Sequence, residues 1–353
     1  MTKNHPRSGS ATLAHSQRTV ALWLLVCCAM IFAMVVVGGL TRLTHSGLSM
    51  VEWDPIVGVI PPLNTAQWTE TFAKYQQTPE YLKINRGMGL AEFKSIFWLE
   101  YYHRLLGRSI GIVFLLPFLY FLLRRRIQRA QVPKFLGMFV LGGLQGALGW
   151  YMVKSGLVDN PHVSQYRLTA HLAAAFIIYS YIFWVALGLL HPQPQHKGGS
   201  AIRRLRHYSL GVSTLIFIMV LSGGFVAGLK AGLAFNTFAT MNGHWVPPGL
   251  FALHPLWHNF FENLATVQFD HRVIAYLLAV VIPLFWWHAR TIKLPARTRL
   301  ATHLLLGMLA VQITLGITTL LFFVPVPLAA AHQAGALVLF TLALFVNHEL
   351  RVA

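Results

Sequence analysis

The stretch VALWLLVCCAMIFAMVVVGGLT, residues 20–41, contains no charged side chain. A run of about 17–25 apolar residues is long enough to cross the hydrocarbon core of a membrane as a helix. Helices satisfy every backbone polar group within one segment, as lipid requires. The sequence therefore predicts an all-α integral membrane protein with eight transmembrane helices, at about 20–41, 105–123, 134–153, 168–190, 208–229, 273–289, 300–323 and 328–347.

The composition and the distribution of charge support this fold class. Hydrophobic residues make up 56% of the chain and charged residues 11%, whereas about a quarter of the residues of a soluble domain are charged. Most basic residues lie in the N-terminal tail and in alternate connections, and every acidic residue except Glu349 lies in the others. The positive-inside rule then predicts that both termini are cytoplasmic. We expect a bacterial inner membrane protein whose net charge of +18 reflects topology and lipid headgroups, with no nucleic-acid partner.

Two long segments are expected on the outer side, at residues 42–102 and 230–270. Segments of this length usually act as lids or binding surfaces. The two cysteines, Cys27 and Cys28, are adjacent inside the first helix. The sequence therefore predicts neither a disulfide between the outer segments nor a cysteine-based metal site.

Four pairs of similar segments recur in the same order along the chain. They are GGLTRLTHSGLS (38–49) and GGFVAGLKAGLA (223–234), EYYHR (100–104) and QFDHR (268–272), LQGALG (144–149) and VQITLG (311–316), and TAHLAAA (169–175) and AAHQAGA (330–336). We interpret the chain as a duplicated four-helix unit. The predicted bundles are residues 20–190 and 208–347, joined by a cytoplasmic linker (191–207) and flanked by cytoplasmic tails (1–19 and 348–353). An even number of helices per unit makes the repeats parallel.

Each predicted bundle carries two histidines near its outer face. His103 and His271 would open the second and sixth helices, and His171 and His332 would lie about one turn inside the fourth and eighth. One such histidine alone is more often a packing residue, but four in register favour a functional site. Two facing imidazoles without cysteine or carboxylate ligands suit the axial positions of a haem iron.

An arginine follows the first histidine of each half. Arg104 and Arg272 could pair with haem propionates, and the alternative is an interfacial arginine that reaches lipid headgroups. Arg42, Trp53 and the 42–102 segment are interpreted as a cap over the first site. Ala227 holds the position of Arg42 in the second half.

The segments GGLTRLTHSGLSMVEW, EYYHRLLGR, LTAHLAAA, FDHR and AAHQAGA together resemble the haem A synthase (CtaA/COX15) family over about residues 20–347. The lack of cysteines in the long first outer segment is similar to the branch with alphaproteobacterial and mitochondrial members. The resemblance implies oxidation of a methyl group of haem O, through hydroxylated intermediates, to the formyl group of haem A for cytochrome oxidase assembly.

The resemblance also implies roles for the histidines and for one glutamate. The family binds a haem B cofactor on two histidines that match His271 and His332, and its substrate haem site matches His103 and His171. The family's E-x-x-H glutamate matches Glu100. Expected partners are lipid, a haem O synthase and oxidase assembly factors; whether the chain forms a homo-oligomer is left open.

Glu100 and Gln268 occupy the same place in the repeat, three residues before a histidine and on the same helical face. A half that removes hydrogen from a methyl group must move protons, so the carboxylate predicts chemistry in the first half and a resident cofactor in the second. Glu100 could instead be a counter-charge for Arg104 or Arg108.

Two rival functions share the histidine pairs. The first is a di-haem cytochrome b-like electron carrier, which would hold two haems of one type and give Glu100 no special role. The second is a transporter of haem or of a small molecule. Without the family resemblance, the residues support the electron carrier and the haem-modifying enzyme almost equally.

Overall fold

The computed structural model describes residues 7–52, 59–157, 163–196 and 198–352. Within these residues the chain is helical with no β-strand, and eight helices are long and apolar enough to cross a membrane, as predicted. They are α1 (Arg7–Leu43), α4 (Leu90–Leu123), α5 (Val132–Gly156), α6 (Gln165–Leu190), α7 (Ser200–Leu229), α9 (Leu264–Arg290), α10 (Ala296–Leu321) and α11 (Val326–Glu349).

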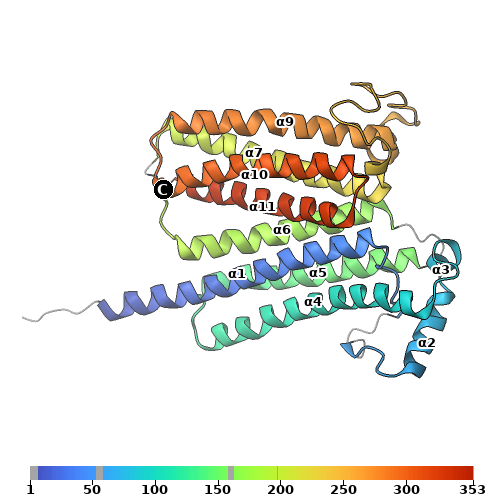
Figure 1. Ribbon diagram of the computed structural model, residues 1–353. Helices are drawn as coiled ribbons and strands as arrows, with labels where there is room; N and C mark the ends of the chain where they lie inside the picture. Colours follow the sequence, from blue (N-terminus) through green and yellow to red (C-terminus); the bar gives the residue numbers. More distant parts are fainter. Residues whose placement is uncertain (1–6, 53–58, 158–162, 197, 353) are drawn as a thin grey trace, which may run out of the picture.

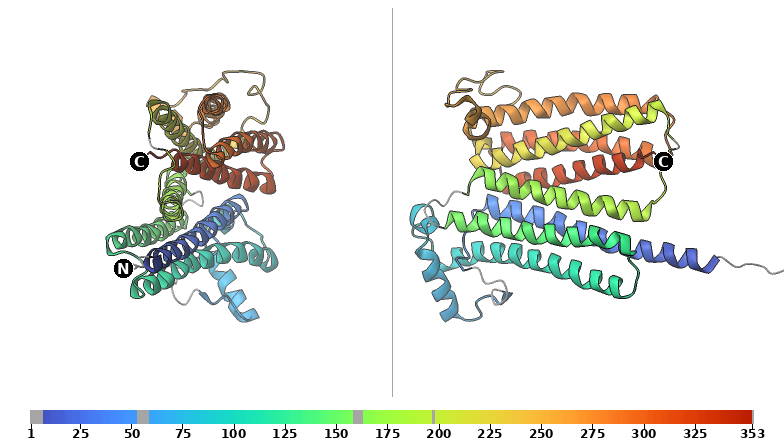
Figure 2. Two further views of the ribbon diagram at one scale, coloured as in Figure 1. Left: turned by 90° about the vertical axis from the view of Figure 1, so that its left-hand side faces the viewer. Right: turned by 180° about the vertical axis from the view of Figure 1, so that it is seen from behind.

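The eight helices run side by side along one common direction (Figure 1). Helices α1, α4, α5 and α6 pack together, as do α7, α9, α10 and α11, and the two groups meet through contacts of α1 with α11 and of α6 with α7 and α11. Both chain ends lie at one end of this bundle, and the segments after α1 and α7 lie at the other (Figure 2). We call the second end the capped end. That the two groups are copies of one repeat stays a prediction.

At the end with the chain termini, an ion pair holds three helices together. Arg297, near the start of α10, donates to both carboxylate oxygens of Glu349 at the end of α11, each at 2.7 Å. Arg351 donates to the carbonyl oxygen of His191, which follows α6, at 2.7 Å. These contacts fix the linker that connects the two groups.

The prediction that His103 and His271 open their helices was wrong about the helix ends. Helix α4 begins at Leu90, where the Glu92 side chain accepts from the Gly89 backbone, and α9 begins at Leu264, where the Asn263 side chain accepts from two backbone N–H groups. Hydrophobic length measures only the part of a helix that lies in lipid, and both helices continue beyond it. The two histidines therefore lie inside continuous helices.

The first outer segment is an ordered helical cap. It contains α2 (Thr65–Gln76) and α3 (Pro79–Lys83), and its aromatic side chains pack on the first turns of α4. The ring centroids of Trp68 and Phe97 are 4.9 Å apart, and those of Tyr75 and Phe93 are 5.0 Å apart. This packing explains why α4 extends so far beyond its apolar stretch. Trp53, which we expected in the cap, lies outside the described residues.

The second outer segment contains short helical turns, η3 (Ala231–Leu233), η4 (Leu256–His258) and α8 (Asn259–Glu262). The buried Asn259 amide of α8 holds η4 and the loop before it, because it donates to the carbonyl oxygens of Leu253 and Leu256 and accepts from the Leu253 N–H. Both outer segments therefore form ordered surfaces over the capped end.

One carboxyl group in the first cap is buried, and no ion pair to it is found among the described residues. Glu80 of α3 is 3% exposed, and its Oε2 lies 3.4 Å from the hydroxyl of Tyr75. Burial, and then the negative charge of Glu100, raise the pKa of Glu80 from 4.5 to about 8. The folded cap therefore holds this proton more tightly than the unfolded chain does.

We predict that the cap loses stability as the pH rises from 4.5 to about 8, because over this interval Glu80 is protonated in the folded cap and ionised in the unfolded chain. Glu80→Gln, which stays neutral, should remove this dependence and stabilise the cap at alkaline pH. Hydrogen exchange of residues 75–85, measured at about pH 6 and about pH 9 after correction for the intrinsic rate, tests this. Equal pH dependence in the two proteins would contradict the assignment.

Candidate functional site

The first histidine pair comes from two helices, His103 from α4 and His171 from α6. Each ring lies against a glycine of a neighbouring helix: a Cβ at Gly38 of α1 would lie 3.1 Å from His103 Nε2, and a Cβ at Gly149 of α5 would lie 3.0 Å from His171 Cε1. Gln145 of α5 also donates to the carbonyl oxygen of His171 at 2.9 Å.

The second pair repeats this arrangement on α9 and α11. A Cβ at Gly223 of α7 would lie 3.4 Å from His271 Cε1, and one at Gly316 of α10 would lie 2.9 Å from His332 Cε1. Gln312 of α10 donates to the His332 carbonyl oxygen at 2.9 Å and lies 3.2 Å from its Nδ1.

The depth of the histidines follows from the helix ends. Helices α4, α6, α9 and α11 all begin at the capped end (Figure 1). His171, His271 and His332 lie about two turns inside their helices, and His103 lies further along α4 because that helix starts within the cap. The structure thus gives each helix group one histidine pair, as the sequence predicted.

Each helix group supplies one pair of histidines, which is the number of protein ligands that a haem iron takes. Haem iron takes two protein ligands because the porphyrin supplies the other four, and no cluster of three or more potential metal ligands occurs among the described residues. Each of the four histidines is partly exposed. Three buried polar atoms at these sites have no hydrogen-bond partner within the described parts of the chain. They are His171 Nδ1, Gln145 Oε1 and Gln312 Oε1.

No role was predicted from the sequence for the glycines and glutamines around the histidine rings. Gly38, Gly149, Gln145 and their counterparts all lie in segments quoted as evidence for the repeat. The sequence signal was therefore present, because each of these residues has an identical residue at the matching position of the other half. Their function could be recognised only once the structure showed which helices face each histidine.

Glu100 is a buried carboxylate whose oxygens are fully engaged. It is 2% exposed and accepts hydrogen bonds from Ser49 Oγ at 2.7 Å, the Met50 N–H at 2.8 Å and Arg104 at 3.0 and 2.5 Å. The ion pair with Arg104, which the sequence offered as the alternative role of Glu100, is therefore present. In the matching place, Gln268 donates to the carbonyl oxygen of Phe235 at 3.0 Å.

Arg104 and Arg272 hold the outer segments above the histidines. Beyond its ion pair, Arg104 donates to the carbonyl oxygens of Met50 at 2.8 Å and Glu52 at 3.0 Å. Arg272 donates to three carbonyl oxygens, those of Phe235 (2.9 Å), Thr237 (2.9 Å) and Thr240 (3.2 Å). Their predicted contact with propionates stays a prediction.

Arg42 connects the two helix groups. Its guanidinium donates to the carbonyl oxygen of Ala227 and lies 3.4 Å from that of Gly228, at the last turn of α7, where carbonyl groups lack partners within the helix. Ala227 is the residue that matches Arg42 in the repeat. Arg42 therefore reaches the other group at the capped end.

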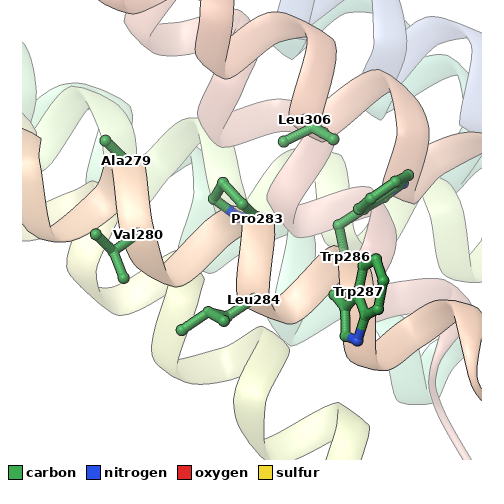
Figure 3. A pocket seen from close by; sticks show the side chains of 7 residues that line it. All are labelled: Ala279, Val280, Pro283, Leu284, Trp286, Trp287 and Leu306. Atoms are coloured by element: carbon green, nitrogen blue, oxygen red, sulfur yellow. The ribbon is translucent and has the colours of Figure 1, made fainter.

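A shallow apolar hollow of about 400 Å³ lies away from these residues, beside Pro283 between α9 and α10 (Figure 3). Its lining is Ala279, Val280, Pro283, Leu284, Trp286, Trp287 and Leu306. None of the four histidines lines it. This hollow is a groove in the apolar surface of the bundle and is separate from the candidate site.

Eight membrane-spanning helices with two histidine pairs near one end define a multi-pass membrane protein whose paired imidazoles suit two haem groups. The chain belongs to the COX15-CtaA family, described as cytochrome oxidase assembly protein, whose family model matches residues 21–344. This confirms the predicted family.

Relatives that are named haem A synthase occur in bacteria and eukaryotes. A "Heme A synthase" of Nitrosospira multiformis is 63% identical over 95% of this chain and 94% of the relative. A "Heme A synthase COX15" of Arabidopsis thaliana is 47% identical over 95% of this chain and 75% of the relative, and one of Bos taurus is 45% identical over 95% and 83%.

We predict that Arg272→Lys will loosen the second outer segment. A lysine carries one point charge and cannot bridge the three carbonyl oxygens that the planar guanidinium reaches. Hydrogen exchange around residues 235–240 should become about tenfold faster or more, since a hydrogen bond to a charged group contributes about 1.5–3 kcal/mol. The matched control is Arg290→Lys at the other end of α9, where Arg290 packs on Trp286. Unchanged exchange in Arg272→Lys would show that the contacts do not hold the segment.

Proposed function

We propose that this protein is a haem A synthase, a membrane oxidoreductase that oxidises a methyl group of haem O to the formyl group of haem A for cytochrome oxidase. The observation that carries this proposal is the pair of similar histidine sites, of which only the first has a buried carboxylate one helical turn before its histidine. The relatives named "Heme A synthase" align with nearly the whole chain and support the same activity.

The first helix group is the proposed substrate site. His103 and His171 would hold the iron of haem O, and Gly38 and Gly149 allow both rings to lie close to neighbouring helices. Arg104, which is 7% exposed at its side chain, would meet a propionate by exchanging a backbone carbonyl for it. Haem O would enter this group from the lipid.

Glu100 is the proposed proton acceptor of the reaction. Its carboxylate is held on α4, the helix of His103, and the ion pair with Arg104 fixes its orientation. Ser49 and Met50, which donate to its Oε2, connect it to the first cap. A proton accepted at Glu100 could therefore leave through the capped end. Gln268, a neutral amide, gives the second group no such acceptor.

The second helix group is the proposed site of a resident haem B, with its iron bound by His271 and His332. When bound, haem B would exchange electrons with the substrate site. Gln312 orients His332 from α10 by its two contacts. Arg272 already holds the outer segment above this site, and its buried Nε has no partner among the described residues, so it keeps one donor for a propionate.

The contact between the helix groups brings together residues that lie beside the two histidine pairs. Gln333, next to His332, donates to the carbonyl oxygen of Val35 at 2.8 Å and packs against Gly39 of α1. Gly39 follows Gly38, which contacts His103. Thr169, two residues before His171, packs in turn against Gly224 of α7. The matching places of Gly39 and Gly224 support the proposed duplication.

The proposed location is the bacterial inner membrane, with both termini in the cytoplasm. The end of the bundle that contains both termini also carries the basic connections, as the positive-inside rule requires (Figure 2). A haem O synthase that supplies the substrate and assembly factors that receive the product complete the proposal.

The first test is to identify the haems that the purified protein holds. Non-covalent haem extracted from protein prepared from its own membranes should contain haem B together with haem O, haem A or a hydroxylated intermediate. Chromatography with mass detection identifies each species. Two haem B per chain and no other haem would favour the cytochrome b-like carrier, and a chain without haem would exclude both haem functions.

We predict that Glu100→Gln will lower haem A formation about 10²–10⁴-fold, the usual contribution of a positioned acid or base. The amide keeps the size of the side chain but cannot accept the proton. Haem B content should stay at the wild-type level, because Glu100 lies in the other helix group. The matched control is Glu70→Gln, a carboxylate on α2 whose side chain is 67% exposed. If Glu100→Gln formed haem A at the wild-type rate, Glu100 would not be the proton acceptor and would serve only as the counter-charge of Arg104.

A further inference from the structure

His271 is held by two consecutive residues of α7. Its Nδ1 lies 3.2 Å from the hydroxyl oxygen of Ser222, and its Cε1 faces Gly223. A histidine that binds a metal through Nε2 must carry its proton on Nδ1, and that N–H needs an acceptor. The Ser222 hydroxyl is placed to accept it. The contact would leave the Nε2 lone pair available to iron.

The first helix group lacks this contact. The residue of α1 that matches Ser222 in the repeat is Val37, directly before Gly38, and a valine side chain cannot accept a hydrogen bond. Within the described residues, no hydrogen bond to the His103 imidazole is found. Gly38 also meets the other edge of the ring, Nε2 and Cδ2, whereas Gly223 meets Cε1 of His271. The two rings therefore differ in how they are oriented.

Resting on the proposed function, we propose that Ser222 is a positioning residue that keeps haem B in the second helix group. Its hydroxyl fixes the tautomer and the orientation of His271, which increases the basicity of the iron ligand. Val37 leaves His103 free of such a constraint, which suits a haem that must enter as substrate and leave as product. The difference between Ser222 and Val37 thereby distinguishes a site that retains its haem from a site that releases it.

The test compares Ser222→Thr with Ser222→Val in the full-length protein. These two side chains have nearly the same shape and differ in a hydroxyl against a methyl group, so steric effects are matched. In Ser222→Val, haem B should be lost to excess apomyoglobin about tenfold faster or more, as is usual when the partner of a ligand histidine is removed. Its midpoint potential should rise, because a less basic ligand stabilises the ferric state less. Ser222→Thr should behave like the wild type.

A third variant controls for a general loss of stability in α7. Ser213→Ala removes a buried hydroxyl of the same helix that accepts from Asn347 at 2.6 Å, away from His271. It should leave both the potential and the rate of haem loss unchanged.

Equal potentials and equal rates of haem loss in Ser222→Thr and Ser222→Val would overturn the positioning role while leaving the proposed function intact. A wild-type protein without haem B would instead overturn the proposed function itself.

Discussion

The structure depends on how a polar ring is held inside a membrane. Lipid offers no hydrogen-bond partner, so an imidazole within a helical bundle must be held by its neighbouring helices. Here each ring lies against a glycine whose missing side chain allows close approach, on a helix next to its own. Both helix groups use this arrangement, and it decides which helices must be adjacent: α1 with α4, α5 with α6, α7 with α9, and α10 with α11.

The outer segments complete the site from the capped end. Two arginines next to the histidines bind backbone carbonyl oxygens of these segments, so that the same turn of helix that presents the imidazole also holds the cover above it. A planar guanidinium suits this function because it offers several donors in fixed directions. In the first half the carboxylate of Glu100 joins the network, and in the second half the amide of Gln268 bonds to the cover directly.

The two helix groups differ at a small number of places within a similar framework. The first group has the buried carboxylate of Glu100 where the second has the amide of Gln268, and it has Val37 where the second has Ser222, whose hydroxyl lies beside His271. The pair Arg42 and Ala227 differs from the others, because these two matching residues are hydrogen-bonded to each other across the boundary between the helix groups. A similar arrangement of helices thus surrounds both histidine pairs, while the polar residues beside the two pairs differ.

The sequence by itself determined the fold class, the number of membrane-spanning helices, the presence of one histidine pair in each helix group and the family, because these depend on apolar length and on short motifs that recur within the chain. It did not determine where α4 and α9 begin, since those ends depend on caps that pack beyond the lipid. The partners of Glu100, Arg104, Arg42 and Ser222 were likewise decided only by the tertiary structure. Hydrogen bonds between distant segments depend on which helices are adjacent and on how each is rotated, and helical periodicity alone specifies neither.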